Sequence, residues 1–249
     1  MIKPTVWIQP GAVIIYGSSL DAAPHSHHAI QLVWPASDSL CRVNEHQLLG
    51  AVLIDSQVEH QLQMSQGWVL LIEAESELGH RLAAILAGRA FYDFNLASSP
   101  VPAPKAQGDD LTRLFTPLFM ALNLGTPRFA VNKHRVGDKR IQQLLTRLDL
   151  CLQGECIKPS RWRAADVAGE LALSESRFLH LFRQELGIAW RPYLLWRRMM
   201  CAIQAMVGDA SATEVAYLAG FSDSAHLSRT FRQTFGMTIR QAKGLFKEQ

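Results

Sequence analysis

A short pattern occurs twice in the C-terminal half of the chain, and this internal repeat limits the possible folds more than any other feature. Residues 182–187 read Phe-Arg-Gln-Glu-Leu-Gly, and residues 231–236 read Phe-Arg-Gln-Thr-Phe-Gly, a displacement of 49. Upstream, Asp-Val-Ala at 166–168 matches Glu-Val-Ala at 214–216, a displacement of 48. The repeat indicates one supersecondary unit used twice, with one additional residue in the turn of the second copy.

Each copy predicts a short helix, a tight turn and a second helix. Ser174 is a typical N-cap for the second helix of copy one, and Ser222 or Asp223 takes this place in copy two. Ala168 and Ala216 are small, as is required where two helices cross steeply over a short turn. The pattern therefore predicts two helix-turn-helix units, at about residues 164–187 and 212–236. In this motif the second helix enters the major groove of DNA.

The second helices have an apolar face and a polar face. Side chains at helical spacing are predicted to point inward: Phe178, Leu181, Phe182, Leu227, Thr230 and Phe231. The outward residues predicted to contact base edges are Ser176, Leu179, His180, Ser224, Ala225, Ser228 and Arg229. One turn further on, Arg183 and Arg232 are predicted to contact backbone phosphate. The alternative is that these are ordinary solvated faces of a helical bundle.

The charge distribution favours a polyanionic partner of the C-terminal half. Residues 1–137 hold 9 Lys and Arg against 11 Asp and Glu, whereas residues 138–249 hold 16 against 11. The net charge of +3 therefore comes from the half that carries the repeat. A moderate excess of this kind is consistent with DNA as the partner.

Composition and cysteine usage exclude several other classes. A chain of 249 residues with 48% hydrophobic and 19% charged residues is globular, not disordered or fibrous. It has no apolar run of membrane-spanning length and no signal-peptide pattern, so we expect a cytoplasmic protein without a membrane partner. The cysteines lack the paired spacing of a zinc site, and we expect reduced, mostly structural thiols: Cys41, Cys151, Cys156 and Cys201. A thiol-reactive effector site at Cys41 is the alternative.

The first ninety residues have a different pattern, that of an antiparallel barrel or sandwich. Short strands separated by turn residues such as Gly67 are predicted at residues 13–16, 29–34, 40–44, 48–54, 60–64 and 68–73. A helix follows at 78–86, then a Pro-rich connection at 98–108. Three apolar stripes at helical spacing follow. The first starts near Asp110, and Pro117 is expected to interrupt its helix. The second starts near Asp138, the expected N-cap, and the third covers residues 192–207. The expected fold class is α+β.

Residues 138–249 resemble the DNA-binding domain of the AraC family of bacterial transcription regulators. The resemblance rests on Ser174 to Gly187, on Tyr193 six residues later, and on the Ala-x-x-x-Gly-Phe-Ser pattern from Ala216 to Ser222. Ile239, Ala242 and Lys243 stand where the family usually has proline, an aromatic residue and a basic residue. The resemblance implies the base-contacting positions given above.

The family often carries an N-terminal cupin-like barrel that binds an effector, and residues 11–96 resemble one. Metal cupins use a His-x-His pair, a carboxylate and a later histidine; here the corresponding set is His25, His27, Gln31 and His60, with glutamine in place of the carboxylate. A divalent metal at His25, His27 and His60 is one interpretation. The second is an organic-effector pocket that also includes Trp34, and the third is that the histidines are structural.

The resemblance implies a three-part chain. The expected parts are an effector-binding and dimerisation barrel (1–97), a linker with a relay or dimerisation helix (98–137) and an AraC-type DNA-binding domain (138–249). The predicted function is promoter recognition coupled to a small effector, with no required cofactor. The predicted partners are double-stranded DNA, the effector, a second copy and, for an activator, RNA polymerase. The alternatives are a metal-sensing regulator, a barrel that only dimerises, and a cupin metalloenzyme fused to a DNA-binding module; we expect no enzyme.

Overall fold

The computed structural model describes residues 5–36, 39–94, 101–104, 110–125, 129, 135–153, 162–208 and 210–247. The chain forms two compact units, Met1–Val131 with Ser228–Gln249 and Asn132–Leu227. The predicted domain limits divide the chain into consecutive segments. The two units group residues by their contacts instead, and one of them joins two separate segments of the chain. The predicted limits therefore stay a prediction. In the part of the chain that is described, no helix has both the length and the apolarity needed to cross a membrane.

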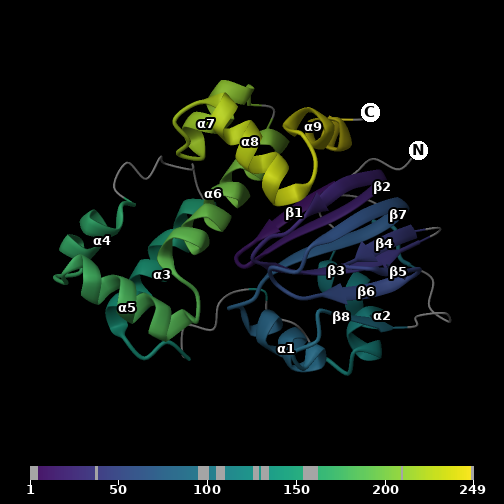
Figure 1. The fold of residues 1–249 in the computed structure, drawn as a ribbon, viewed down its shortest axis with the longest axis horizontal. Helices are drawn as coiled ribbons and strands as arrows, with labels where there is room; N and C mark the ends of the chain where they lie inside the picture. The colour runs from purple at the N-terminus through teal and green to yellow at the C-terminus, as the bar shows by residue number, and fades with distance from the viewer. Residues whose placement is uncertain are drawn as a thin grey trace. The chain divides into compact units, whose positions relative to one another are not determined.

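The first unit is built on an antiparallel sheet, drawn in purple and blue in Figure 1. Its described strands are β1 (Thr5–Gln9), β2 (Ala12–His25), β3 (Ala29–Pro35), β4 (Ser39–Val43), β5 (His46–Leu48), β6 (Ala51–Ile54), β7 (His60–Glu73) and β8 (Phe91–Phe94). The order is β1-β2-β7-β3-β6-β8, and β4 pairs with both β5 and β7. This arrangement confirms the predicted antiparallel strand domain and the α+β class.

The long strand β7 differs from the sequence prediction. Residues 60–64 and 68–73 were expected to form separate strands around a turn at Gly67, but β7 continues through this glycine. Gly67 has φ +155°, and a Cβ atom there would lie 2.6 Å from the carbonyl oxygen of Trp34 and 2.7 Å from Cα of Pro35. The glycine therefore permits a close approach of two paired strands rather than a turn.

Two helices cover one face of this sheet and lie below the strands in Figure 1. They are α1 (Glu77–Leu86), close to the predicted helix, and α2 (Leu111–Ala121). Residues of α2, including Phe115 and Leu118, share one core with Trp34 and Trp68 of the strands. The expected interruption at Pro117 is wrong, because the helix continues through it with apolar residues buried on both sides. The apolar stripe of α2 thus packs inside the unit, and the relay or dimerisation role of this helix stays a prediction.

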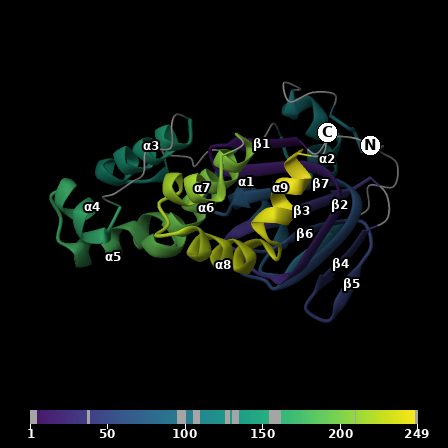
Figure 2. The ribbon, with the colours of Figure 1, turned by 90° about the horizontal axis from the view of Figure 1, so that it is seen from above.

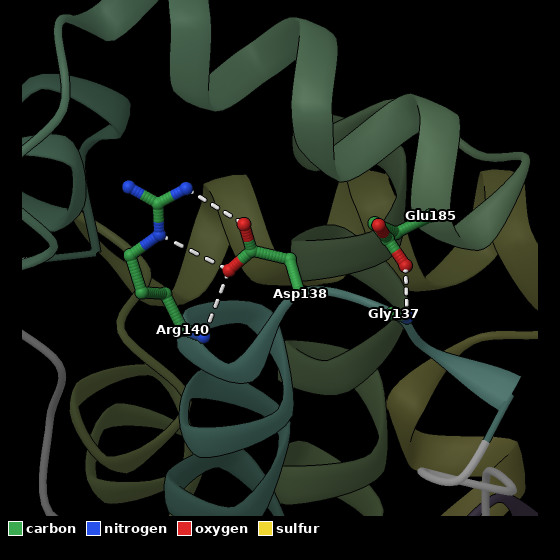
Figure 3. A network of polar contacts seen from close by, with 4 residues as sticks. All are labelled: Gly137, Asp138, Arg140 and Glu185. Carbon is green, nitrogen blue, oxygen red and sulfur yellow. Dashed lines mark hydrogen bonds and ion pairs between the residues drawn. The ribbon is translucent and has the colours of Figure 1, made fainter.

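The second unit is helical. It contains α3 (Lys139–Gln153), α4 (Ala164–Glu170), α5 (Glu175–Leu186), α6 (Trp190–Val207), α7 (Ala212–Leu218) and the first residues of α8 (Ser224–Phe235). Helix α9 (Ile239–Lys247) belongs to the first unit. Figure 3 shows the start of α3, where Oδ1 of Asp138 accepts from the amide of Arg140 at 2.8 Å, which confirms the predicted N-cap. Beside it, the amide of Gly137 donates to Oε2 of Glu185 at 2.6 Å and so ties this segment to α5.

Candidate functional site

The first repeat copy folds as predicted, into α4, a tight turn and α5. The Ser174 side chain accepts a hydrogen bond from the amide of Arg177 at 3.3 Å, which confirms this residue as the N-cap. Ala172, in the turn, has φ +53°. The amide of Leu173 donates to the carbonyl of Ala168 at 2.8 Å and closes the turn.

The second copy repeats this geometry in α7, its turn and α8. The amide of Phe221 donates to the carbonyl of Ala216 at 2.8 Å, the counterpart of the bond in copy one. Oδ1 of Asp223 accepts from the amide of His226 at 2.7 Å, so the N-cap is Asp223 rather than Ser222. Equivalent hydrogen bonds at equivalent positions show that the sequence repeat is a structural repeat.

Arg198 supports the second turn and was not singled out from the sequence. Its guanidinium in α6 donates to the carbonyls of Ala219 and Gly220 and lies 4.0 Å from the ring centroid of Phe221. These carbonyls lie in the turn between α7 and α8, so Arg198 positions this turn on the connecting helix. The available signal was a charged residue inside the apolar stripe of residues 192–207.

The predicted DNA-contacting residues lie on accessible faces of α5 and α8. Exposed in the structure are Ser176, His180, Arg183, Ala225, Ser228, Arg229 and Arg232, and half-buried are Leu179 and Ser224. On the opposite face of α5, Phe178 and Phe182 are buried and lie 5.3 Å and 5.0 Å from Trp190 between ring centroids. Thr230, expected to point inward, is half-buried. Accessibility is a condition for DNA contact, and the contacts themselves stay a prediction.

The structure also brings three predicted histidines together in the first unit. His25 ends β2, His60 begins β7 as its cross-strand partner, and His27 follows β2 in the connection to β3. The ring centroids lie 4.3 Å apart for His25 and His60, 5.2 Å for His27 and His60, and 5.5 Å for His25 and His27. All three side chains are buried. We call His25, His27 and His60 the histidine cluster.

Backbone carbonyls orient each ring of the histidine cluster. Nδ1 lies 2.8 Å from the carbonyl oxygen of residue 23 in His25, and 2.9 Å from those of residues 29 and 58 in His27 and His60. A carbonyl oxygen only accepts, so the hydrogen of the neutral ring is placed on Nδ1. Burial, and then the neighbouring histidines, lower the pKa of His27 to about 4 and that of His60 to about 3, and burial lowers the pKa of His25. The cluster is neutral at pH 7, with Nε2 as the lone-pair atom.

The other two residues of the predicted pocket, Gln31 and Trp34, lie on different sides of the sheet. Gln31 joins the cluster, because its side-chain amide lies 3.2 Å from Nε2 of His27; with the lone pair on that nitrogen, the amide faces the ring with its NH2 group, which donates to Nε2. Trp34 does not, because three residues further along β3 its side chain lies on the opposite face of the sheet, in the core with Trp68 and α2. The histidine cluster and Gln31 therefore form the candidate site of this unit.

The donor set of the histidine cluster fits a divalent metal ion. Its ligand nitrogens all lie within 4.8 Å of one another, and Nε2 of His60 is buried without a hydrogen-bond partner among the described residues. Metal-bound histidines commonly donate their second ring N–H to a backbone carbonyl, the arrangement seen here. Nitrogens around a tetrahedral zinc lie about 3.4 Å apart, so the rings would have to move closer together.

Comparison with known proteins identifies the C-terminal part. Residues 167–244 match the family model described as a helix-turn-helix domain. The chain is 31% identical over 83 residues to the virulence regulon transcriptional activator VirF of Yersinia enterocolitica, covering 33% of this chain and 31% of VirF. It is 30% identical over 108 residues to the transcriptional activator RhaS of Escherichia fergusonii, covering 43% of this chain and 38% of RhaS. The matched segments thus span about a third of these relatives.

A solved structure extends the likeness to the whole fold. An apo variant of ToxT from Vibrio cholerae superposes with a TM-score of 0.53 over 96% of this chain and 99% of its own, at 15% identity. At this identity the likeness concerns the fold alone, and it covers the strand domain as well as the helices. Together with the repeated turn geometry, the family match and the relatives show that residues 167–244 form a helix-turn-helix domain.

Proposed function

We propose that the chain is a sequence-specific DNA-binding transcription regulator in which the strand domain senses a small effector. The observation that carries the proposal is the structural repeat, since it leaves two second helices with accessible polar faces. Arg229 is suited to bidentate contact with guanine, and serines such as Ser228 to contact with base edges or phosphate. Double-stranded promoter DNA is the partner, and a second copy and RNA polymerase are proposed with it.

Selection from random DNA tests this function directly. The full chain is incubated with a pool of random duplexes, and the enriched sequence is compared with a scrambled duplex across salt concentrations. We expect the enriched site to be bound about 10³-fold or more tightly than the scrambled duplex, with affinity falling as salt rises. Equal affinity for both duplexes would contradict a sequence-specific regulator.

A divalent metal ion as the effector is favoured by the histidine cluster. Three buried neutral imidazoles in the protonation state that metals require, one with an unpartnered Nε2, support this second proposal. When bound, the ion would be held by histidines at the end of β2 and at the start of β7, and would so link these two strand ends. The test is the metal content of protein purified without an affinity tag. We expect near-stoichiometric metal in wild type and in the exposed-site control His46→Ala, and its loss in His60→Ala.

An organic effector is the alternative occupant of the strand domain. One solved ToxT structure of the same fold, with a TM-score of 0.50 and 14% identity, is described as bound to an unsaturated fatty acid. Metal-free wild-type protein whose melting temperature rises with a fatty acid or another metabolite would favour this alternative. No shift with any ligand or metal would favour a strand domain that only dimerises.

A further inference from the structure

The end of helix α8 lies against the histidine cluster within the first unit. The amide of Ala23 in β2 donates to the carbonyl of Gly236, the residue after α8, at 2.9 Å. The carbonyl of the same Ala23 accepts from Nδ1 of His25 at 2.8 Å. Figures 1 and 2 show the end of α8, in yellow, beside the strands of this unit. One residue of β2 thus connects a ring of the cluster to the last turn of the second helix-turn-helix.

The glycine at this contact has a role that its repeat counterpart lacks. Gly236 has φ +66°, and a Cβ atom there would overlap the carbonyl oxygen of Ala23 and lie 2.7 Å from Nδ1 of His25. Gly187, at the same place after α5, has φ +77°, and an added Cβ atom there would meet nothing within 4 Å among the described residues. Both glycines end a helix, but only Gly236 also lets the backbone approach the cluster.

The last turn of α8 adds an apolar contact on the same side. Phe235 is buried, and its ring centroid lies 6.4 Å from that of His27 and 4.7 Å from that of Phe231. The outward residues Ser228, Arg229 and Arg232 of the same helix remain exposed. The contact therefore uses the end and inner face of α8 and leaves its proposed reading face accessible.

We propose that the second helix-turn-helix responds to metal at the histidine cluster through Ala23 and Gly236; this inference rests on the proposed metal site. A metal ion on Nε2 of His25 makes its Nδ1–H a stronger donor to the carbonyl of Ala23. It also draws the three rings together, which fixes His25 where Gly236 contacts it. Metal thereby holds the end of α8 on β2. By thermodynamic linkage, a ligand that binds this held state more tightly raises the affinity for metal by the same factor by which metal raises the affinity for that ligand.

Hydrogen exchange of the full-length wild-type chain tests the proposal without any substitution. Amide exchange is measured with and without one equivalent of Zn²⁺, and bound zinc is quantified in the same samples. We expect zinc to slow exchange of the Ala23 amide, whose acceptor is Gly236, and of the last turn of α8 by about tenfold. The last turn of α5 should not respond, and it serves as the internal reference.

A matched pair of variants separates coupling from metal binding. Gly236→Ala and Gly187→Ala carry the same backbone strain, but only the first blocks the approach to Ala23. We expect both to bind one zinc ion, and only Gly236→Ala to lose the zinc-dependent protection of Ala23. Should Gly236→Ala fail to fold, the wild-type exchange experiment still decides.

The outcomes distinguish this inference from the metal site itself. Zinc that binds to wild type without slowing exchange at Ala23 or in α8 overturns the coupling and leaves the metal site intact. Protection by zinc that persists in Gly236→Ala also overturns the coupling through this residue. Wild-type protein that binds no zinc overturns the metal site and the coupling together.

Discussion

Nη2 of Arg197 in α6 lies 2.9 Å from Oδ1 of Asp149 in α3, and their side chains are only 3% and 13% exposed. Removing one member of a buried pair takes away an opposite charge that offsets the burial of the other. We expect Asp149→Ala to lower the free energy of unfolding by about 3 kcal/mol in a urea titration. The exposed pair of Arg147 and Glu170, also anchored in α3, is the control, and Glu170→Ala should cost less than about 1 kcal/mol. Similar losses in both variants would contradict a special role for the buried pair.

The helix-turn-helix units could be predicted because their signals are local. N-caps such as Ser174 and Asp138, and the spacing of Phe178 and Phe182, depend on residues within a few positions of one another. The repeat added a second, independent copy of each signal. The alternative between Ser222 and Asp223 stayed open, because both have capping side chains and only the turn geometry selects Asp223.

The strand domain was harder to predict because strand pairing is non-local. The edge strand β1 was missed, and Gly67 has its conformation because Trp34 and Pro35 of another strand approach it. The His-x-His pattern grouped the histidines, but their meeting depends on the end of β2: His25 ends this strand and pairs with His60, and His27 follows in the connection to β3. The contact of Gly236 with β2 joins residues more than two hundred positions apart in the sequence, and no local pattern indicates it.

Glu75, in the turn between β7 and α1, predicts a pH dependence of stability. Burial, and then the charge of Glu73, raise the pKa of Glu75 to about 7. A carboxyl group whose pKa is higher in the folded state binds more protons when folded, so stability falls as pH rises from about 4.5 to about 7. We expect Glu75→Gln to leave the urea midpoint at pH 5 nearly unchanged and to raise stability at pH 8 by about 2 kcal/mol. A variant that follows the wild-type pH profile would show that Glu75 does not titrate in this range.

We expect Gly67→Ala to destabilise the strand domain more than Gly50→Ala, where the added Cβ meets no neighbouring atom among the described residues. The new Cβ would meet backbone atoms of Trp34 and Pro35, which cannot move without disturbing the pairing of β3 with β7. At Gly50, φ is +116° and nothing among the described residues lies within 4 Å of an added Cβ, so Gly50→Ala carries the strain alone. We expect a loss of about 1 kcal/mol for Gly50→Ala and at least about 2 kcal/mol more for Gly67→Ala in urea unfolding. Equal losses would indicate that β3 and β7 can separate at this point without cost.

Arg229 and Arg232 separate base reading from phosphate contact on one helix. Both are exposed on α8, but Arg229 lies nearer the N-terminal end, the end that contacts bases in this motif. We expect Arg229→Ala to lose about 1 to 3 kcal/mol on the selected duplex and to relax preference at one base pair. Arg232→Ala should weaken binding to selected and scrambled duplexes alike and reduce the slope of log affinity against log salt by about 1. The test is to measure the affinity of each variant for the selected and the scrambled duplex at several salt concentrations. The same pattern of loss in the two variants would contradict the distinction between a base-reading and a phosphate-contacting arginine.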